Sequence, residues 1–211
     1  MISIEKFIFN DFQVNTFILW DETKDCLIVD PGCITLEERN DFMEYFSKNK
    51  LKPVKIINTH CHVDHILGNA FIFKNFNIPT AAHKDEQYLL EGIVEYGQML
   101  GFMVDRPPDI NEYLEEDSMV KFGKSKLKIL HVPGHSRGSI ALYSPDQKFI
   151  IAGDVLFYGG IGRTDLPGGN YDTLINSIKT KILTLPGDVI VYPGHGPSTT
   201  VKAETDTNPF L

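Results

Sequence analysis

The sequence predicts a mixed α/β fold in a single domain, and three observations support this prediction. Apolar runs of strand length recur along the whole chain and are bounded by glycine, proline or polar turn residues. Amphipathic helical periodicity alternates with these runs in the first half, whereas strands follow one another more closely in the second. A chain of 211 residues can bury one sizeable core. No linker divides residues 1–211, so we expect one domain with two similar halves.

The first part of the chain is predicted to form strands that are joined by short helices. Apolar and polar residues alternate over residues 1–9, as expected for a half-buried strand, and the polar residues 21–25 can form a hairpin loop. Asp30–Gly32 forms a turn, after which Thr35 or a neighbour can cap an amphipathic helix. The predicted elements are strands over 1–9, 14–20 and 26–29, a helix over 35–49, a strand over 54–58, a helix over 68–76 and a strand over 80–83.

Residues 84–104 are interpreted as a helix that glycines interrupt. Its apolar side chains favour a core role over a cofactor site, although Met99–Met103 fit either a substrate wall or a dimer contact. The loop that continues it, residues 105–109, is suited to overhang a site. The remaining predicted elements are strands over 118–122, 126–132, 139–143 and 149–152, a helix over 171–183, a last strand over 189–192 and one short helix in the tail.

Composition and charge restrict the function classes. The formal net charge of −8 argues against a nucleic-acid-binding protein, which would normally present a basic face. No apolar run approaches the length of a membrane span, and the N-terminus lacks the pattern of a signal peptide. The odd number of cysteines, Cys26, Cys33 and Cys61, disfavours a disulfide framework and favours a reducing cytoplasm. We expect no nucleic-acid or membrane partner, and we interpret Cys61 as a packed thiol.

The segment Thr59–Gly68 concentrates the candidate chemistry of the chain. Three histidines and an aspartate lie within six residues there, directly behind a predicted strand, where packing gives no reason for them. Imidazole and carboxylate ligands together suit zinc, iron or manganese. His60 and His62 can converge on one ion, while Asp64 and His65 reach a second.

Three further strand ends carry residues that can bind a metal. His135, Asp154 and His195 each follow a predicted strand with a glycine immediately before them. Glycine permits the sharp turn that directs such a side chain inward. A lone histidine usually has a structural role, but with the first segment these residues make seven candidate ligands. That number suffices for two metal ions that share Asp154.

The order and spacing of these motifs resemble the metallo-β-lactamase superfamily over nearly the whole chain. The residues that carry the resemblance are Asp30–Gly32, His60–His65, Pro133–Ser136, Gly153-Asp154 and Pro193–Gly196. Residues 153–166 and 207–211 are similar to the small glyoxalase-II-like hydrolases of that superfamily. The resemblance implies an αββα sandwich, in which two mixed β-sheets are flanked by helices and both metals lie at one edge.

The resemblance also implies two divalent metal ions, with zinc favoured and iron or manganese open. The implied ligands are His60, His62 and His135 for the first ion, Asp64, His65 and His195 for the second, and Asp154 as the bridge between them. Asp30 is implied to support a ligand without contacting a metal. His83 and His131 match no ligand position, and we interpret both as structural.

A metal-dependent hydrolase that cleaves a small anionic thioester, such as S-lactoylglutathione, is the implied function. In such an enzyme a hydroxide that bridges the metals attacks the thioester carbonyl. Asp64 is the expected catalytic residue, which orients the nucleophile and takes its proton. Arg163 and Tyr158 are expected to contact the substrate, although a structural pair between Arg163 and Asp165 fits the sequence nearly as well. A homo-oligomer is possible.

The residues leave other functions open. Full-length glyoxalase II carries a basic helical domain after the last metal histidine, whereas only residues 196–211 follow His195 here, so another carrier thiol is possible. A persulfide dioxygenase of the same fold would hold a single iron on His60, His135 and Asp154. β-Lactamase activity is disfavoured by the lack of a signal peptide, and nuclease activity by the acidic charge. A degenerate binding module should have lost ligands, and this chain has all seven.

Overall fold

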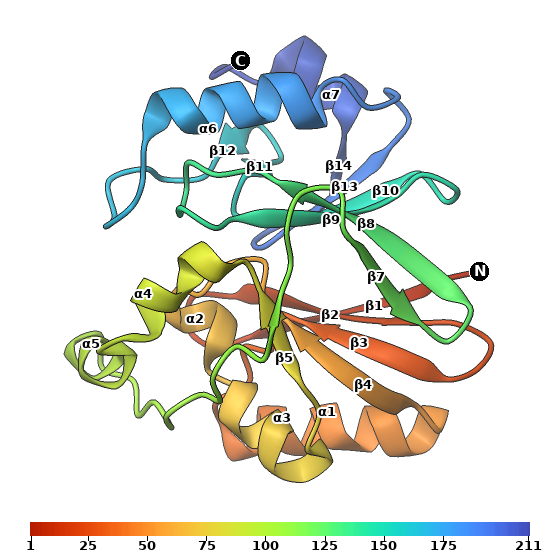
Figure 1. Cartoon of the computed structure of the whole chain (residues 1–211), viewed down its shortest axis with the longest axis vertical. Coiled ribbons are helices and arrows are strands. Elements are labelled where there is room, and N and C mark those ends of the chain that lie inside the picture. The colour runs from red at the N-terminus through yellow and green to blue at the C-terminus, as the bar shows by residue number, and fades with distance from the viewer.

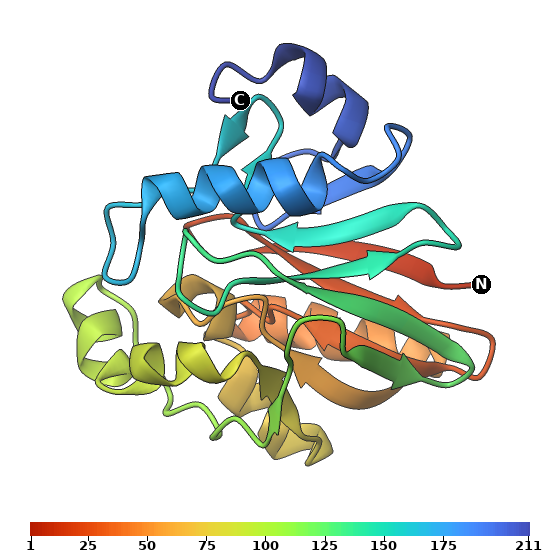
Figure 2. The ribbon, with the colours of Figure 1, turned by 45° about the horizontal axis from the view of Figure 1, so that its top comes forward.

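The computed structural model describes residues 1–211 and has four layers, in which two β-sheets are stacked between two layers of helices (Figures 1 and 2). Helices from the first half of the chain cover one sheet, and helices from the second half cover the other. The arrangement is the αββα sandwich that the resemblance implied, so the predicted fold is confirmed.

The first sheet is built from the N-terminal half of the chain. Its strands, in spatial and sequence order, are β1 (Ser3–Phe9), β2 (Val14–Trp20), β3 (Asp25–Val29), β4 (Lys52–Ile57), β5 (Thr80–Ala82) and β6 (Glu112–Tyr113). β1, β2 and β3 are antiparallel neighbours, whereas β3 to β6 run parallel and are connected through helices. The predicted strands agree with β1 to β5 within two residues, and β6 is too short to give a sequence pattern.

The second sheet is built from the C-terminal half. In spatial order its strands are β14 (Thr199–Thr200), β13 (Ile190–Pro193), β10 (Phe149–Gly153), β9 (Ile140–Ser144), β8 (Ser125–His131) and β7 (Met119–Phe122). Among the neighbouring strands of this sheet, β10 and β13 are parallel and every other pair is antiparallel. The five predicted strands are confirmed within one residue, but the prediction that residues 189–192 form the last strand is wrong, because β14 follows. The small hairpin of β11 (Leu156–Phe157) and β12 (Gly160–Ile161) also lacks a sequence pattern.

Alternate side chains of each strand belong to different layers of the core. Phe17 and Leu19 of β2 pack between the two sheets, whereas Ile18 packs under the helices of the first half. In β10, Ile151 lies between the sheets and Ile150 lies under the helices of the second half. Both faces of each sheet are covered, which explains why these strands are continuous apolar runs in the sequence.

The helices pack as amphipathic elements on the outer faces of the sheets. They are α1 (Leu36–Asn49) and α3 (Asn69–Phe76) on the first sheet, with α6 (Tyr171–Ser177) and α7 (Val201–Thr207) on the second. α1 begins as predicted, because Thr35 and Glu38 hydrogen-bond to each other's backbone amides in a capping box. The predicted helix 171–183 continues past α6 as the π-helical segment η2 (Ile178–Ile182). No helix is both long enough and apolar enough to cross a membrane.

The predicted helix over residues 84–104 is interrupted at two of its three glycines. The observed elements are a 3₁₀ turn, η1 (Lys84–Glu86), then α4 (Gln87–Leu90) and α5 (Ile93–Met99). Gly92 and Gly101 have φ angles of 73° and 86°, a left-handed conformation that is incompatible with a continuing helix. Gly97 lies inside α5 and does not interrupt it.

The loop over residues 105–109 does not line the groove that contains the candidate ligands, so the prediction that it overhangs a site there is wrong. Arg106 and Asp109 line a surface hollow together with Glu91 and Glu95, which belong to the segment of α4 and α5. No candidate ligand borders that hollow. The loop and the helical segment that precedes it in the sequence therefore border the same hollow.

Candidate metal centre

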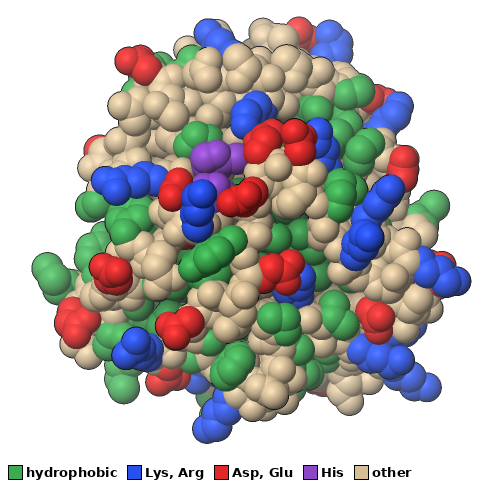
Figure 3. Space-filling view, viewed as in Figure 1, with side chains coloured by type: hydrophobic (Ala, Val, Ile, Leu, Met, Phe, Trp, Pro, Cys, Tyr) green, Lys and Arg blue, Asp and Glu red, His purple; other side chains and the backbone are tan.

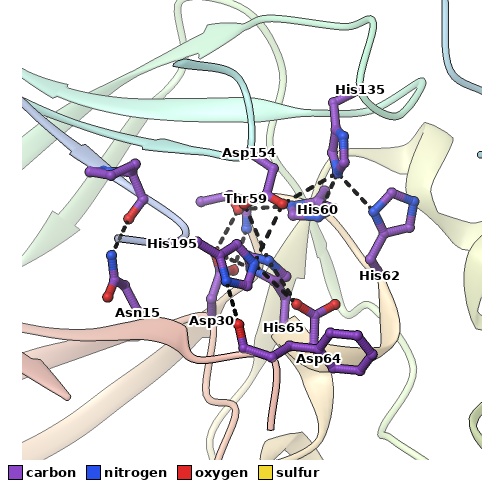
Figure 4. Close-up of polar contacts among 12 residues, drawn as sticks. Asn15, Asp30, Thr59, His60, His62, Asp64, His65, His135, Asp154 and His195 are labelled. Carbon is purple, nitrogen blue, oxygen red and sulfur yellow. Dashed lines mark hydrogen bonds and ion pairs between the residues drawn. The ribbon is translucent and has the colours of Figure 1, made fainter. Parts of the chain in front are cut away.

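Strands that run in the same direction deliver their ends to one edge of the sandwich. β3 is parallel to β4, and β10 is parallel to β13, while β8 has the direction of β10 because two antiparallel steps separate them. The residues that follow these strand ends include Asp30, His60, His135, Asp154 and His195. The structure thus brings together all the strand-end residues that the sequence indicated (Figure 4).

His60, His62 and His135 form a first set of facing ring nitrogens. The Nε2 atom of His135 lies 2.8 Å from Nδ1 of His62 and 3.2 Å from Nε2 of His60. All three rings are buried. Burial and the neighbouring imidazoles lower the pKa of His60 well below its ordinary value, so its ring is neutral and its lone pair is available.

Asp64, His65 and His195 form a second set, and Asp154 lies between the two sets. The Oδ2 atom of Asp64 lies 3.2 Å from Nε2 of His195 and 3.5 Å from Nε2 of His65. The carboxylate of Asp154 lies 3.4 Å from Nε2 of His65 and 3.6 Å from Nε2 of His195. It also lies 3.7 Å from Nε2 of His135 in the first set. Asp154 is therefore placed to serve both sets.

The chemistry of these groups fits divalent metal ions. The Nε2 atom of His65 and the Oδ1 atom of Asp154 are buried without a hydrogen-bond partner. Burial of such atoms is unfavourable unless something satisfies them. Imidazole nitrogens and carboxylate oxygens are ligands that zinc, iron and manganese accept. The residues present therefore fit one ion in each set.

Hydrogen bonds on the far side of two rings determine which nitrogen faces the centre. The Nδ1 atom of His135 lies 2.8 Å from the carbonyl oxygen of Arg163, and that of His195 lies 2.9 Å from the carbonyl oxygen of Phe12. A carbonyl oxygen can only accept a hydrogen bond, so each Nδ1 carries the proton. Each Nε2 therefore faces the centre and is the ring atom that would bind a metal ion there.

Asp30 supports the centre from behind His65. Its carboxylate accepts hydrogen bonds from the amide of Thr59 at 2.7 Å and from the Thr59 hydroxyl at 2.6 Å. Its Oδ2 atom lies 3.0 Å from Nδ1 of His65. A buried carboxylate in this position fixes both the orientation and the tautomer of a ligand histidine. This is the placement that the resemblance implied for Asp30.

Two glycines beside the ligands are required by the local geometry. A side chain at Gly194 would overlap the carboxylate of Asp154 and the ring of His65. Gly134 has a φ angle of 134°, a backbone conformation that residues with a side chain rarely adopt. The turn at Gly134 leads directly into His135. The glycines that mark the strand ends in the sequence thus allow the ligands to approach one another.

Glu86 is a residue of this centre that carries no signal in the sequence. It is fully buried, and its carboxylate accepts hydrogen bonds from the amide of Cys61 at 2.6 Å and the amide of Gly138 at 2.7 Å. The hydroxyl of Ser136 donates a third, at 2.7 Å. Cys61 lies between two candidate ligands, His60 and His62, and Ser136 follows His135, so Glu86 joins the two loops that carry the first set. Burial raises the pKa of Glu86 to about 7, although these donors oppose the shift.

A groove opens at the centre and is lined by five of the candidate ligands, His62, Asp64, His135, Asp154 and His195. Of the two residues expected to contact substrate, Arg163 lines this groove and Tyr158 does not. The guanidinium of Arg163 forms two hydrogen bonds with the carboxylate of Asp165, at 2.8 and 2.7 Å, so the alternative structural pair is present. Tyr158 is exposed at the turn between β11 and β12, where Phe157 instead approaches the ring of His195. The role of both residues in substrate binding stays a prediction.

His83 and His131 lie apart from the seven candidate ligands. Their rings stack with centroids 4.1 Å apart and an interplanar angle of 8°. The Nδ1 atom of His83 accepts a hydrogen bond from the amide of Asp85, and Nε2 of His131 lies 3.0 Å from the carbonyl oxygen of Arg137. Ring atoms that are already hydrogen-bonded fit the structural role predicted for this pair.

The sandwich and the histidine–aspartate centre at its edge define a class of metal-dependent proteins, and comparison with known proteins identifies the family. The family model that describes the Metallo-beta-lactamase superfamily matches residues 9–195 of the chain. The chain belongs to the metallo-β-lactamase superfamily, whose fold implies divalent metal ions.

Similar proteins include metallo-hydrolases. Over 201 residues the chain is 40% identical to "Probable metallo-hydrolase YqgX" from Bacillus subtilis, covering 94% of this chain and 92% of that protein. It is 35% identical over 207 residues to "Hydroxyacylglutathione hydrolase GloC" from Haemophilus influenzae, covering 95% and 93%. The structure of BLEG-1 B3 metallo-beta-lactamase matches with a TM-score of 0.90, 33% identity and 99% coverage of both chains. TTHA1623 in a di-iron-bound form matches with a TM-score of 0.88, 34% identity and coverage of 98% and 100%.

Proposed function

We propose that this protein is a dinuclear metal-dependent hydrolase that cleaves small anionic thioesters of the S-lactoylglutathione type. The observation that carries the proposal is the position of the Asp154 carboxylate between two complete ligand sets. The ligands of one ion would be His60, His62 and His135, those of the other Asp64, His65 and His195, and Asp154 would be shared. Zinc is the favoured metal, and the di-iron form of TTHA1623 keeps iron open.

Bound ions of this kind supply a hydroxide nucleophile near neutral pH and polarise a carbonyl oxygen. The chain's own contribution is Asp64, whose carboxylate faces the groove. Burial alone would raise the pKa of Asp64, but the charge of His65 and a hydrogen bond from His195 lower it below its ordinary value. Asp64 is then ionised at neutral pH and can orient the attacking water and accept its proton. The carbon–sulfur bond breaks, and a carboxylic acid and a thiol are released.

Support for a thioester substrate comes from the likeness to hydroxyacylglutathione hydrolase GloC, which spans 93% of that protein. The alternative, a persulfide dioxygenase, has weaker support. ETHE1 from Myxococcus xanthus matches with a TM-score of 0.81, but at 22% identity the likeness concerns the fold alone. A single iron on His60, His135 and Asp154 would also leave the second set without a metal.

Metal analysis combined with a hydrolysis assay on the same sample tests this proposal. Protein purified from its native cells should contain about two metal ions per chain and should hydrolyse S-lactoylglutathione. A chelator should abolish this turnover, and added zinc, iron or manganese should restore it. One iron per chain, no hydrolysis and oxygen uptake with glutathione persulfide would instead establish the dioxygenase.

The two ligand sets are expected to differ in how their metal affinity depends on pH. Burial alone would lower the pKa of His65, but Asp64, Asp154 and Asp30 raise it well above its ordinary value. A histidine whose pKa lies well above its ordinary value of 6.5 is protonated at neutral pH, so a metal must displace that proton from His65. In the first set, burial lowers the pKa of His62 to about 3, and no proton competes there near neutrality.

Metal affinity of the second set should therefore fall as the pH is lowered from about 8 to about 6, by about tenfold per pH unit for each proton displaced. Affinity of the first set should change little over that range. Calorimetric zinc titrations of the metal-free protein at both pH values measure the two phases, and His62→Ala and His195→Ala assign them. Equal pH dependence of both phases would contradict the prediction.

Removal of the Arg163 side chain is expected to raise KM for an anionic thioester slightly, and this increase should depend on the salt concentration. The exposed guanidinium is already paired with Asp165, and exposed pairs contribute about 0–1 kcal/mol. Arg163→Ala should raise KM for an anionic thioester by less than about tenfold at low salt and leave kcat unchanged. Asp165→Asn, which frees the guanidinium, should lower KM. An unchanged KM in both variants would remove Arg163 from the substrate site.

A further inference from the structure

A second cavity adjoins the groove that contains the candidate ligands, and the proposed reaction does not use it. The cavity has a volume of about 220 Å³ and shares His62, Val63, Tyr96 and Leu166 with the groove. The two spaces therefore meet beside His62, a ligand of the first set. A substrate centred over the ligands can extend one arm into this cavity.

Packed, mostly apolar side chains form the walls of the cavity. Val63 and Ile93 are almost fully buried in one apolar cluster, against which Leu89 packs. The hydroxyl of Tyr88 donates a hydrogen bond to the carbonyl oxygen of Pro167 at 2.8 Å and fixes another wall. Figure 3 shows hydrophobic side chains at the surface over α4 and α5, the segment that supplies much of this lining. Preformed apolar walls are typical of small-molecule sites.

The charges around the cavity disfavour an anionic occupant. No lysine or arginine lines it, and Glu91 is its one acidic side chain. The guanidinium of Arg137 lies over the ring of Tyr88 at 4.8 Å and is not part of the lining. A carboxylate in the part of the cavity beside Glu91 would lose hydration and meet that acidic side chain, with no lysine or arginine to offset either effect. An apolar group would instead be stabilised in the cavity, because burial of apolar surface away from water lowers the free energy.

We propose that this cavity binds the acyl chain of the substrate and selects thioesters of apolar aliphatic or aryl acids. The inference rests on the proposed thioester hydrolysis. A water molecule occupies about 30 Å³, so the cavity has room for about seven non-hydrogen atoms. A tripeptide carrier such as glutathione carries carboxylates, for which the cavity offers no cationic side chain. The carrier is therefore placed along the groove, which Arg163 and Phe12 line.

A series of glutathione thioesters from acetyl to decanoyl, assayed with the metal-loaded enzyme, tests the inference. Burial of one methylene group strengthens binding by about fourfold. The value of kcat/KM should therefore rise by about that factor with each added methylene, from acetyl as far as hexanoyl. The gain should stop once the chain exceeds about seven atoms. S-lactoylglutathione should be hydrolysed less efficiently than its deoxy analogue, the propionyl thioester, because its hydroxyl group loses hydration in the cavity.

Variants of the lining should shift this chain-length profile in opposite directions. Leu166 lies partly exposed in a loop, where Leu166→Trp can fill the cavity without disturbing the core, and the optimum should move to shorter acyl chains. Leu89→Ala enlarges the cavity, and the optimum should move to longer chains. Leu36→Trp is the matched control, because Leu36 is exposed on α1 and does not line the cavity. Its profile should equal that of the wild type.

The outcomes separate this inference from the function on which it rests. If every thioester is turned over but kcat/KM is independent of acyl length, the inference is wrong and the thioesterase remains. The same holds if Leu166→Trp and Leu89→Ala leave the profile unchanged. If the metal-loaded protein hydrolyses no thioester of the series, the proposed function itself fails, and the acyl site fails with it.

Discussion

Replacement of Asp154 by asparagine is expected to lower kcat/KM for thioesters by more than about 100-fold and to reduce the metal content. Asp154 is the side chain whose carboxylate approaches His135 of one ligand set and both His65 and His195 of the other. Loss of a group that only orients a ligand lowers affinity or activity about 10–100-fold, so loss of a shared ligand should exceed that range. Asparagine keeps the shape of the side chain but removes its charge.

Elemental analysis and thermal unfolding with and without zinc measure the effect on metal binding. At a free metal concentration about 1,000 times Kd, the wild type should gain about 4 kcal/mol, or about 8–16 °C in Tm. Asp154→Asn should lose most of that gain. Asp146→Asn is the control, since Asp146 is exposed in the turn before β10, at the opposite end of the same strand. A variant at position 154 that retains both metals would show that this carboxylate is not shared.

The seven candidate ligands could be predicted from the sequence because their signal is local. His135, Asp154 and His195 each follow a strand and a glycine, and the other four lie in one short segment. Their meeting at one edge follows from strand direction, which the sandwich fold imposes on the whole chain. The capping box of Thr35 and Glu38 is local in the same sense, so the start of α1 was predictable.

Features that depend on contacts between distant segments could not be predicted. Glu86 meets Cys61 and Ser136 across 25 and 50 residues, and nothing in its own neighbourhood in the sequence indicates burial. The apolar cavity is likewise shared between the segment of α4 and α5 and a loop around Leu166. The break in the predicted helix 84–104 depends on which glycines adopt a left-handed conformation, and periodicity does not distinguish Gly92 from Gly97.

Glu86→Gln is expected to separate a role in metal binding from a role in stability. In the folded protein burial raises the pKa of Glu86 to about 7, from an ordinary value of 4.5. Its contribution to stability is therefore complete below about pH 4.5 and is lost as the pH rises to about 7. At about pH 8 the wild type contains a buried carboxylate that no lysine or arginine neutralises. Removal of this charge should offset the loss of one hydrogen-bond acceptor, so glutamine should not lower the Tm of the metal-free protein.

Metal binding by the variant should nevertheless be weaker. A glutamine amide replaces one of the two acceptor oxygens, so one of the donors from Cys61, Ser136 and Gly138 loses its partner and the ligand loops are less well fixed. Affinity of the first ligand set for zinc should fall about 10–100-fold at about pH 8. Glu44→Gln, the same change at an exposed position of α1, should alter neither quantity.

A residue that served stability alone would give the opposite result, a lower Tm in the metal-free protein and an unchanged zinc affinity of the folded state. The distinction matters because a buried carboxylate without a cation is unfavourable above its pKa. Divalent ions held by the neighbouring His60 and His62 would make that charge less unfavourable, since opposite charges favour the ionised form. Metal-free and metal-loaded wild type should therefore differ most in stability above about pH 7, where Glu86 is ionised.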